Sequence, residues 1–588
     1  MFKPLAALTS FALFLTGCVA QTTPAPVAAP PTPDPAPAFA GAVTTADPRA
    51  TAAGEAILAK GGSATDAAIA VMLALTVVEP QSSGIGGGGF LVHAGPDGVT
   101  TFDGRETAPA SATPARFLDE DGERLPYETR VLSGLSVGVP GNVALAKLAH
   151  EKYGKLPWID LFGPAYTLAS RGFQMNRRLH ASLSGRAERA GLTPEAREVF
   201  YAQGDEPLPV GSTVVPRALA FTLEALAKDG PEFFYDYLPG ELAAYVAAAT
   251  PQDGAMSEAD VSAYTAKVRE PVCSLYRGYR VCGMGPPSSG GVAVSQMLGQ
   301  LERFDLAALG PDSARFWHLF LESQRIAYAD RELYLADADF VEVPVEGLID
   351  PAYLAQRSAL IDPSGALASV EAGTPPGAPL ARADGDEPPE SGTTHFAIVD
   401  AQGNAVSYTS TIEGAFGSGL YFRGFYLNNE LTDFSSSFEK DGRPVANRVE
   451  GGKRPRSSMA PTIVFDPAGE VFLVIGAAGG PTIPVQVARS IIGVIDFGMS
   501  AKEALALPLF MSFGEVAIAE EGSVIEDIAQ ELEALGHAQI RFISPRGKTN
   551  ALLRTPQGWE AADDPRIAPL LSYEPVAGEA EAGAADAP

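Results

Sequence analysis

An irregular segment in the middle of the chain, residues 373–392, constrains the fold more than any other feature. It contains Thr-Pro-Pro-Gly-Ala-Pro and then Asp-Gly-Asp-Glu-Pro-Pro-Glu-Ser-Gly, which favour neither helix nor strand. A structureless stretch of this length is uncommon inside a compact protein. Thr393 follows it directly and begins a run of β-forming residues. The chain therefore divides into two ordered blocks, and residues 372–392 are predicted to be flexible.

The block before this segment, residues 41–372, is expected to be mainly helical. A Gly-Gly pair leads into Ser63, and an almost wholly apolar run follows from Ala64 to Leu75. Ser63 is a suitable N-cap residue, and a helix that is apolar on every face is a buried one. Residues 316–334 carry an apolar stripe and predict a second long helix.

The block after the segment, residues 393–573, has a different pattern. Short β-type runs separated by Gly or Asp turns occur at 395–400, 403–411, 462–465 and 471–475. Helical patterns follow around 484–496 and 524–535. Strands and helices in such numbers favour an α+β protein in which stacked sheets are covered by helices.

The first residues are typical of an export signal. Lys3 precedes an apolar stretch, Leu5 to Leu15, that is too short to span a bilayer as a permanent helix. The stretch ends in Leu-Thr-Gly-Cys18, which resembles a bacterial lipobox. Residues 1–17 are therefore predicted to be removed and Cys18 to be lipidated. An ordinary secretory signal with a chance cysteine is the alternative.

Two further segments are expected to lie outside the folded part. Residues 18–40 are rich in Pro, Ala and Thr and predict a flexible tether. Residues 574–588 are acidic and rich in Ala and Gly, which predicts a disordered tail. With the lipobox, these features predict a protein on the periplasmic face of the cell envelope, held by lipid alone.

Charge and cysteine spacing exclude some functions. The chain has 71 acidic against 42 basic residues and a net charge of −29, which argues against nucleic acid as a partner. Cys273 and Cys282 flank a predicted hairpin centred on Arg277-Gly278, which places the two thiols opposite each other, close enough for a disulfide. Two half-buried free thiols are the alternative. The six His and this Cys pair show no zinc pattern.

Thr393 is the candidate catalytic nucleophile. If the chain is cut before it, the new α-amine titrates near pH 8 and lies within reach of the Thr393 hydroxyl. The residue then carries its own base and needs no histidine. The simpler interpretation is that Thr393 and Thr394 only open a strand.

Motifs in both blocks decide between these interpretations. The first block carries Gly-Gly-Ser-Ala-Thr-Asp-Ala-Ala (61–68), Gly-Ile-Gly-Gly-Gly-Gly-Phe (84–90), Asp-Gly-Arg-Glu-Thr-Ala-Pro (103–109), Val-Pro-Gly-Asn (139–142) and Pro-Pro-Ser-Ser-Gly-Gly (286–291). The second carries Thr-Ser-Thr-Ile-Glu-Gly-Ala-Phe-Gly-Ser-Gly (409–419), Leu-Asn-Asn-Glu-Leu-Thr-Asp-Phe-Ser (427–435), Lys-Arg-Pro-Arg-Ser-Ser-Met-Ala-Pro-Thr (453–462) and Gly-Ala-Ala-Gly-Gly-Pro (476–481). Together these motifs resemble the γ-glutamyltransferase family of N-terminal-nucleophile (Ntn) hydrolases, because they occur in the order found in that family.

The resemblance implies an αββα sandwich that is assembled from two subunits of one precursor, residues 41–392 and 393–573. It implies cleavage between Gly392 and Thr393, after which Thr393 is the nucleophile. Thr411 would orient the Thr393 hydroxyl. Gly479 and Gly480 would supply N–H groups to an oxyanion.

The resemblance also implies a pocket for a γ-glutamyl group, which carries both an α-carboxylate and an α-ammonium. Arg105, Ser457 and Ser458 would bind the carboxylate. Glu430 and Asp433 would bind the ammonium. The alternative for Arg105 is that it forms a surface ion pair. The alternative for Ser457 and Ser458 is that they belong to an ordinary loop. The Gly-rich run 84–90 lacks the Lys-Ser/Thr of a phosphate loop and is interpreted as tight packing.

Two departures from the family leave the substrate open. Glu413 stands where many members have Asn, and the stretch between Asp433 and Ser457 is short and resembles members without a lid. Glutathione is the default acyl donor, with water, an amino acid or a peptide as acceptor, and no metal or organic cofactor is implied. The alternatives are a cephalosporin (glutaryl) acylase-like amidase of the same family and a non-catalytic envelope binding lipoprotein.

Overall fold

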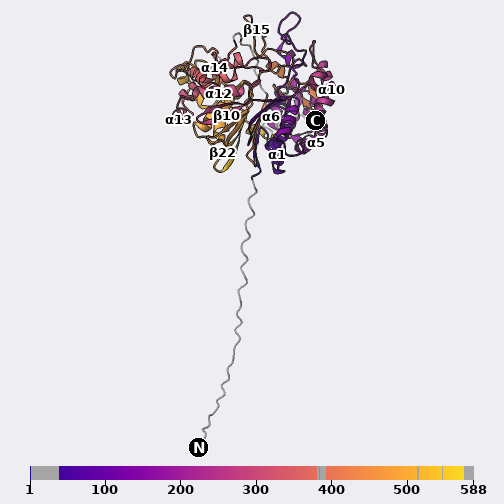
Figure 1. The fold of residues 1–588 in the computed structure, drawn as a ribbon. Coiled ribbons are helices and arrows are strands. Elements are labelled where there is room, and N and C mark those ends of the chain that lie inside the picture. Colours follow the sequence, from indigo (N-terminus) through magenta and orange to yellow (C-terminus); the bar gives the residue numbers. More distant parts are fainter. Residues whose placement is uncertain (2–38, 380–382, 384–391, 513–515, 546, 575–588) are drawn as a thin grey trace, which may run out of the picture. The chain divides into compact units, whose positions relative to one another are not determined.

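The computed structural model describes residues 1, 39–379, 383, 392–512, 516–545 and 547–574. The chain forms two units, Met1–Phe39 and Ala40–Pro588, and the described helices and strands belong to the second (Figure 1). The predicted signal, Cys18, nearly all of the tether, most of the segment before Thr393 and the tail after Glu574 lie outside the described residues. Within the described part of the chain, no helix combines the length and the apolar character needed to cross a membrane.

Two six-stranded antiparallel sheets form the centre of this unit. The first sheet has the order β1 (Gly41–Thr45), β11 (Thr394–Asp400), β12 (Ala405–Thr411), β2 (Gly88–Gly95), β3 (Gly98–Asp103) and β8 (Lys267–Arg269). The second has the order β23 (Gly558–Asp563), β22 (Thr549–Thr555), β18 (Val471–Ala477), β17 (Thr462–Phe465), β10 (Tyr279–Gly283) and β9 (Val272–Tyr276). Each sheet takes strands from both sides of Thr393.

The sheets pack face to face, and helices cover their outer faces. The first sheet is covered by α1 (Pro48–Ala59), α2 (Ala64–Val78) and α4 (Asn142–Tyr153), with α5 (Gly163–Arg171) packed on α2. The second is covered by α12 (Gly290–Leu301), α17 (Ile483–Ile495) and α18 (Ala501–Ala506), with α14 (Ala314–Tyr334) packed on α12. In Figure 1 the labels of α1 and α5 lie to the right of those of β10 and β22, whereas the labels of α12 and α14 lie above them. The four layers are those of an αββα sandwich.

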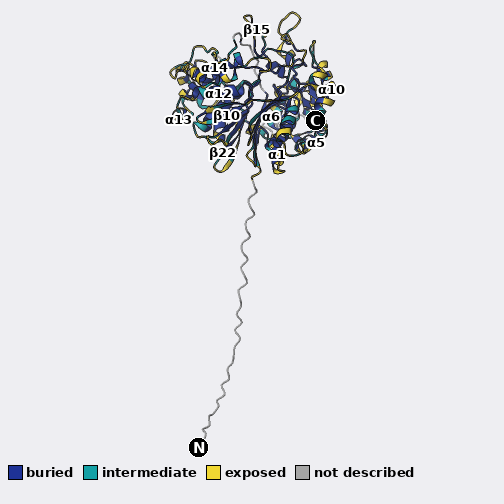
Figure 2. Cartoon of the chain, in the orientation of Figure 1, coloured by how far each residue is buried: buried dark blue, intermediate teal, exposed yellow. Residues whose placement is uncertain are grey.

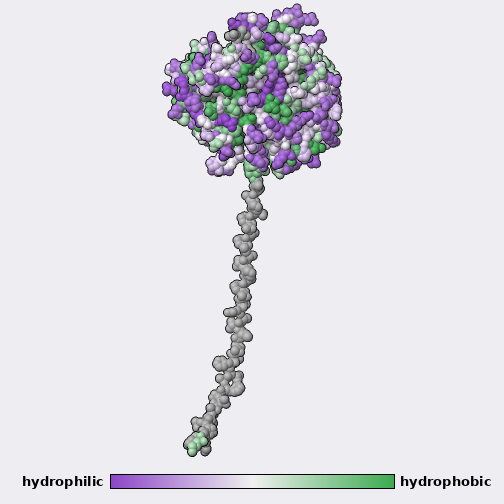
Figure 3. Space-filling model, in the orientation of Figure 1, coloured by the Kyte–Doolittle hydropathy of each residue, from purple (hydrophilic) through white to green (hydrophobic). Residues whose placement is uncertain are grey.

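Further elements surround these layers. The longer helices are α6 (Arg177–Gly185), α8 (Pro194–Phe200), α9 (Arg217–Asp229), α10 (Pro239–Ala248) and α16 (Pro351–Ser358). A small sheet is formed by β19 (Phe510–Ser512), β20 (Ala517–Glu520) and β21 (Ile540–Ile543). Buried residues fill the sheets and the helices on them (Figure 2), and polar and apolar residues are interspersed on the visible surface (Figure 3).

The alternation of side chains along β11 explains why this strand lies between layers. Phe396 and Ile398 belong to the core beneath α1 and α2. Ala397 and Val399 belong to the core between the two sheets. Every residue of β11 is buried, as expected for a strand with side chains packed on both faces.

Several sequence predictions are confirmed. The apolar run after Ser63 is a fully buried helix, and the Ser63 side chain accepts the N–H of Asp66 in a capping box. The predicted hairpin has the expected register, with Tyr276 opposite Tyr279 and Cys273 opposite Cys282. In the structure these two cysteines form a disulfide with a Cα–Cα distance of 4.1 Å.

The first block is mainly helical, as predicted, and it also supplies β1, β2, β3 and β8 to one sheet and the hairpin strands β9 and β10 to the other. β1, β2, β3 and β8 were not predicted, and pairing with neighbouring strands decides their conformation. One prediction is wrong in part. The helix expected over 524–535 is broken at Ile528 into α19 (Val524–Asp527) and α20 (Ala529–Ala534).

Candidate active site

Strand pairing brings Thr393 to its partner. Thr393 directly precedes β11, and Thr411 is the last residue of β12. The two strands are antiparallel neighbours, with Thr394 opposite Ser410. The same register therefore sets Thr393 beside Thr411, although the two residues are far apart in sequence. Both are buried.

The two threonine hydroxyls surround the carbonyl group of Gly392. Thr393 Oγ1 contacts the carbonyl oxygen of Gly392 and lies 3.2 Å from Thr411 Oγ1. Thr411 Oγ1 donates to the same carbonyl oxygen at 3.0 Å and accepts the N–H of Glu413 at 2.8 Å. Two hydroxyl groups thus meet at the peptide bond between Gly392 and Thr393.

The backbone around this peptide bond is closely packed. The N–H of Gly392 donates to the carbonyl of Glu413 at 2.6 Å. A Cβ at Gly392 would lie 2.5 Å from that same oxygen, so no larger residue fits without movement. Gly87, in the Gly-rich run, likewise abuts the carbonyl of Thr411, where a Cβ would overlap it. This supports the interpretation of that run as tight packing.

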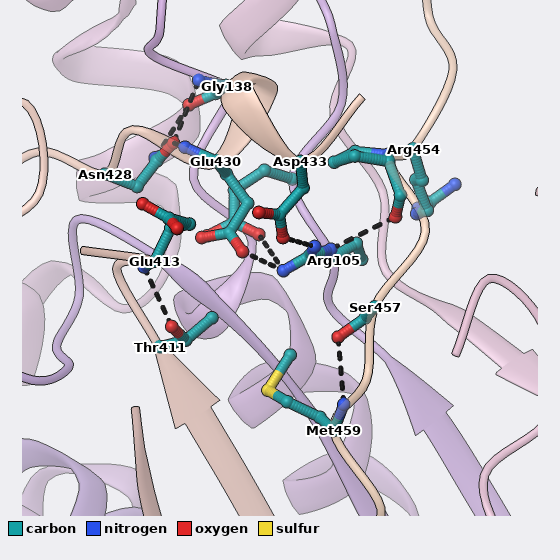
Figure 4. Close-up of polar contacts among 12 residues, drawn as sticks. Arg105, Gly138, Thr411, Glu413, Asn428, Glu430, Asp433, Arg454, Ser457 and Met459 are labelled. Atoms are coloured by element: carbon teal, nitrogen blue, oxygen red, sulfur yellow. Dashed lines mark hydrogen bonds and ion pairs between the residues drawn. The ribbon is translucent and has the colours of Figure 1, made fainter. Parts of the chain in front are cut away.

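Arg105 lies in an ion-pair cluster, which Figure 4 shows together with Thr411. Its two terminal nitrogens pair with Glu430 and Asp433, which belong to one turn of 3₁₀ helix. Arg105 also donates to the carbonyls of Pro455 at 3.2 Å and Arg456 at 2.9 Å. The Arg105 side chain is 1% exposed, which excludes a surface ion pair. The family resemblance implies separate ligand roles for Arg105 and the two acids, whereas in the structure they pair with one another.

The cluster contains more carboxyl groups than positively charged groups. Glu106 lies 3.9 Å from Arg105, and the Glu413 carboxylate accepts a hydrogen bond from Asn429. Burial raises the pKa of Glu106 and of Glu413 to about 8 each, with Asp433 adding to the effect at Glu413. Burial also raises the pKa of Glu430 well above its usual value. An acid-rich buried site of this kind suits a cationic ligand group.

Ser457 and Ser458 lie in a buried loop that two helices hold in place. Ser457 Oγ accepts the N–H of Met459 at 3.2 Å (Figure 4). Ser458 Oγ accepts from Arg331 of α14 at 2.8 Å. The Ser457 carbonyl accepts both the N–H and the hydroxyl of Ser289, before α12, at 2.7 Å each. The loop is therefore a fixed part of the core and not an ordinary surface loop.

Gly479 and Gly480 follow β18 in a turn that needs glycine. Their φ angles are 121° and 56°, a region that residues with a Cβ rarely adopt. The preceding residue, Ala478, donates its N–H to the carbonyl of Lys548 at 2.8 Å. The side chain of Lys548 in turn reaches Thr393. The glycine turn is thus connected to Thr393 through Lys548.

Sequence reasoning missed Lys548 and Glu79. Lys548 Nζ donates to the carbonyl of Thr393 at 2.7 Å and to Glu79 at 3.1 Å. Glu79 also accepts the hydroxyl of Thr394 at 2.8 Å. Neither residue belongs to a recognisable catalytic motif. Tertiary packing alone brings each of them to the site. No signal in the sequence could have identified them.

The chain was compared with known proteins. The family model for gamma-glutamyltranspeptidase matches residues 50–569. The glutathione hydrolase proenzyme of Bacillus subtilis (strain 168) is 39% identical over 514 residues, which cover 84% of this chain and 85% of that protein. The acylase ACY 1 proenzyme of Pseudomonas sp. (strain V22) is 36% identical over 533 residues, covering 89% and 91%.

A solved structure agrees with these matches. The cephalosporin acylase from Bacillus halodurans superposes with a TM-score of 0.78 and 26% identity, covering 92% of this chain and 98% of that one. The four-layer fold, the two hydroxyls at Gly392 and the extent of the family match point to the same class of Ntn-type enzymes. The chain belongs to the γ-glutamyltranspeptidase family.

Proposed function

We propose that this protein cleaves itself between Gly392 and Thr393 and then transfers γ-glutamyl groups from a donor such as glutathione to water or to an amine. The observation that carries the proposal is the meeting of the Thr393 and Thr411 hydroxyls at the Gly392 carbonyl. The names of relatives such as the Bacillus subtilis glutathione hydrolase proenzyme support the same activity.

In self-cleavage, Thr393 Oγ forms a bond to the carbonyl carbon of Gly392 while Thr411 polarises the carbonyl oxygen. The Thr393 hydroxyl gives up its proton, the C–N bond to Thr393 breaks, and the leaving nitrogen takes up that proton, so that an ester joins Gly392 to Oγ. Water hydrolyses the ester, which leaves a free carboxylate on Gly392 and a free α-amine and hydroxyl on Thr393. No group outside the chain is required except water.

In the transfer reaction, the α-amine of Thr393 accepts the proton of its own hydroxyl as Oγ bonds to the γ-carbonyl carbon of the donor. The donor amide bond breaks, and the proton passes to the leaving nitrogen. Water or an acceptor amine then attacks the γ-glutamyl ester. The glycine turn at Gly479 and Gly480 is proposed to donate N–H groups to the oxyanion.

The acid-rich cluster supports a donor with an α-ammonium. Glu413, Glu430 and Asp433 surround Arg105. Burial is the main cause of the raised pKa of Glu413 and repulsion by Asp433 adds to it, so a bound cation would relieve that second effect. A glutaryl side chain lacks this ammonium and would bring no positive charge to these acids. Because acylases are among the similar proteins, hydrolysis of glutaryl amides is the second candidate function.

Mass spectrometry of the purified protein tests the cleavage. Two chains are expected, one of which begins at Thr393, and Thr393→Ala is expected to remain as one chain. An intact wild-type chain, or a cut at another residue, would contradict the proposal. The same spectrum tests lipidation, since the predicted lipid would appear on a chain that starts at Cys18.

Paired substrates test the donor. The matched anilides of γ-glutamate and glutarate differ only in the α-ammonium. The γ-glutamyl anilide is expected to react with the higher kcat/KM, and faster cleavage of the glutaryl anilide would favour the acylase function. Thr393→Ala should cleave neither, which controls for a contaminating hydrolase.

A further inference from the structure

The buried side chain of Lys548 ends beside the nucleophile. Its Nζ lies 2.7 Å from the carbonyl oxygen of Thr393, 3.1 Å from Glu79 Oε2 and 3.2 Å from Ser82 Oγ. Three acceptors match the three protons of an ammonium group, whereas a neutral amine has only two. The residue is 7% exposed, so water does not compete freely for these protons.

Both ends of Lys548 are held. Its carbonyl accepts the N–H of Ala478 at 2.8 Å, next to the glycine turn. At the other end Glu79, the residue that caps α2, pairs with Arg178 and accepts the hydroxyl of Thr394 at 2.8 Å. The ammonium group is therefore fixed relative to the first residues of β11.

We propose that Lys548 is a positioning residue for Thr393: its ammonium group holds the Thr393 carbonyl and, after cleavage, keeps the adjacent α-amine in its unprotonated, basic form. This inference rests on the proposed function. The carbonyl oxygen and the nitrogen of one residue are about 3–4 Å apart by covalent geometry. The new amine thus lies roughly 4–6 Å from Nζ, a distance at which two buried cations repel each other strongly.

The charged groups around Lys548 act in both directions. Burial lowers the pKa of Lys548 well below its usual value, and Arg178 acts in the same direction while Asp47 opposes it. The Glu79 carboxylate, at 3.1 Å, favours the ammonium form. Ser82 and the Thr393 carbonyl add neutral acceptors, and on the other side of Thr393 the neighbouring groups are the Thr411 hydroxyl and the backbone of Glu413. Among the contacts of the described residues, Lys548 is the cationic side chain that contacts Thr393 directly.

The pH dependence of kcat/KM tests this role, because its acid limb reports the base of the free enzyme. Processed wild type is assayed from acid to alkaline pH with the γ-glutamyl anilide, or with the glutaryl anilide if that is the one cleaved. Lys548→Met is expected to move the acid limb upward by about 1 pH unit. Lys548→Gln, which can still donate to the Thr393 carbonyl, should show the same shift, since the charge and not the hydrogen bond is responsible.

Two variants serve as controls. Lys548→Arg keeps the charge and should keep the limb at its wild-type position, and Ser82→Ala removes one acceptor without changing the charge. If Lys548 has only a structural role, Lys548→Met and Lys548→Gln should lower kcat/KM without moving the acid limb of its pH profile. That outcome would overturn the inference while leaving the proposed function intact.

A second measurement needs no variant. The rate at which an amine-acylating reagent labels Thr393 in processed wild type, followed by mass spectrometry against pH, gives the pKa of the α-amine directly. It is expected to lie below the ordinary α-amino range of about 7.7–8.0. An amine with an ordinary pKa would contradict the inference even if every neutral variant failed to fold. Wild type that cleaves neither anilide would instead contradict the proposed function.

Discussion

Thr411 contacts both groups that react in the proposed self-cleavage. Its hydroxyl donates to the Gly392 carbonyl at 3.0 Å and lies 3.2 Å from the Thr393 hydroxyl. Thr411→Val keeps the shape and β-branching of the side chain but removes this donor. Self-cleavage should slow by roughly 100-fold, the usual effect of losing one donor to a developing oxyanion. The fraction of uncut chain on a denaturing gel, followed over time, measures it.

Thr409→Val is the matched control for this prediction. Thr409 lies on the same strand, and its hydroxyl contacts His395 at 2.9 Å and not the cleavage site. The control should be cut at nearly the wild-type rate. Equal rates for Thr411→Val and wild type would show that the hydroxyl has no part in the reaction.

Glu413 makes stability depend on pH. Burial raises its pKa in the folded protein from 4.5 to about 8. Below pH 4.5 the carboxyl is protonated in both states, whereas between 4.5 and 8 only the unfolded chain ionises. Folding therefore loses stability as pH rises through this range. Glu413→Gln removes the titration and should be more stable than wild type by an amount that grows with pH, on the order of 2 kcal/mol by pH 7.

Thermal unfolding of both proteins at several pH values measures this difference. Glu55→Gln, on the exposed side of α1, should show no such trend. A constant Tm difference between Glu413→Gln and wild type from pH 5 to pH 8 would rule out the raised pKa.

At this scale the sequence identified residues but not their contacts. Motif resemblance found Thr393, Thr411 and the acids around Arg105, because each lies in a short recognisable string. It could not predict that Arg105 is already paired with Glu430 and Asp433, since those contacts join distant parts of the chain. Lys548 was missed because a single lysine has no pattern.

At the scale of elements, the start of α2 is a local structure with a measurable contribution. Ser63 Oγ accepts the N–H of Asp66 at 3.1 Å, and Asp66 accepts the N–H of Ser63 at 2.9 Å. Ser63→Ala should lower the free energy of unfolding by about 1 kcal/mol, as for other N-caps. Chemical denaturation measures it. Ser184→Ala, at an exposed position of α6, should change stability by less than about 0.5 kcal/mol, and an equal loss in both variants would count against a specific cap.

Elements with strong local patterns were predictable, and those that depend on partners were not. The apolar run of α2 and the hairpin between β9 and β10 each carry their own signal of periodicity or turn. By contrast, β8 has three residues and gains its conformation from pairing with β3. The break at Ile528 also followed from no local residue preference.

At the scale of the whole molecule, the proposed cut before Thr393 would not separate two domains. β11 pairs with β1 and β12 pairs with β2, so the first sheet is hydrogen-bonded across Thr393. The pairing of β10 with β17 does the same in the second sheet. The cleaved chains should therefore elute together at the position of uncut Thr393→Ala in size-exclusion chromatography, and separate only in denaturant. Separation under native conditions would contradict the shared sheets.

A freshly cut polypeptide usually frays at its new end. Here the end that the proposed cleavage would form, Thr393, directly precedes an interior strand with a neighbour on each side, and its carbonyl accepts a hydrogen bond from Lys548. The conformational entropy that is lost when Thr393 is held in place is therefore lost as the uncut precursor folds. Under this proposal the processed protein would inherit a chain terminus that is already ordered, so cleavage would change its chemistry without loosening its structure.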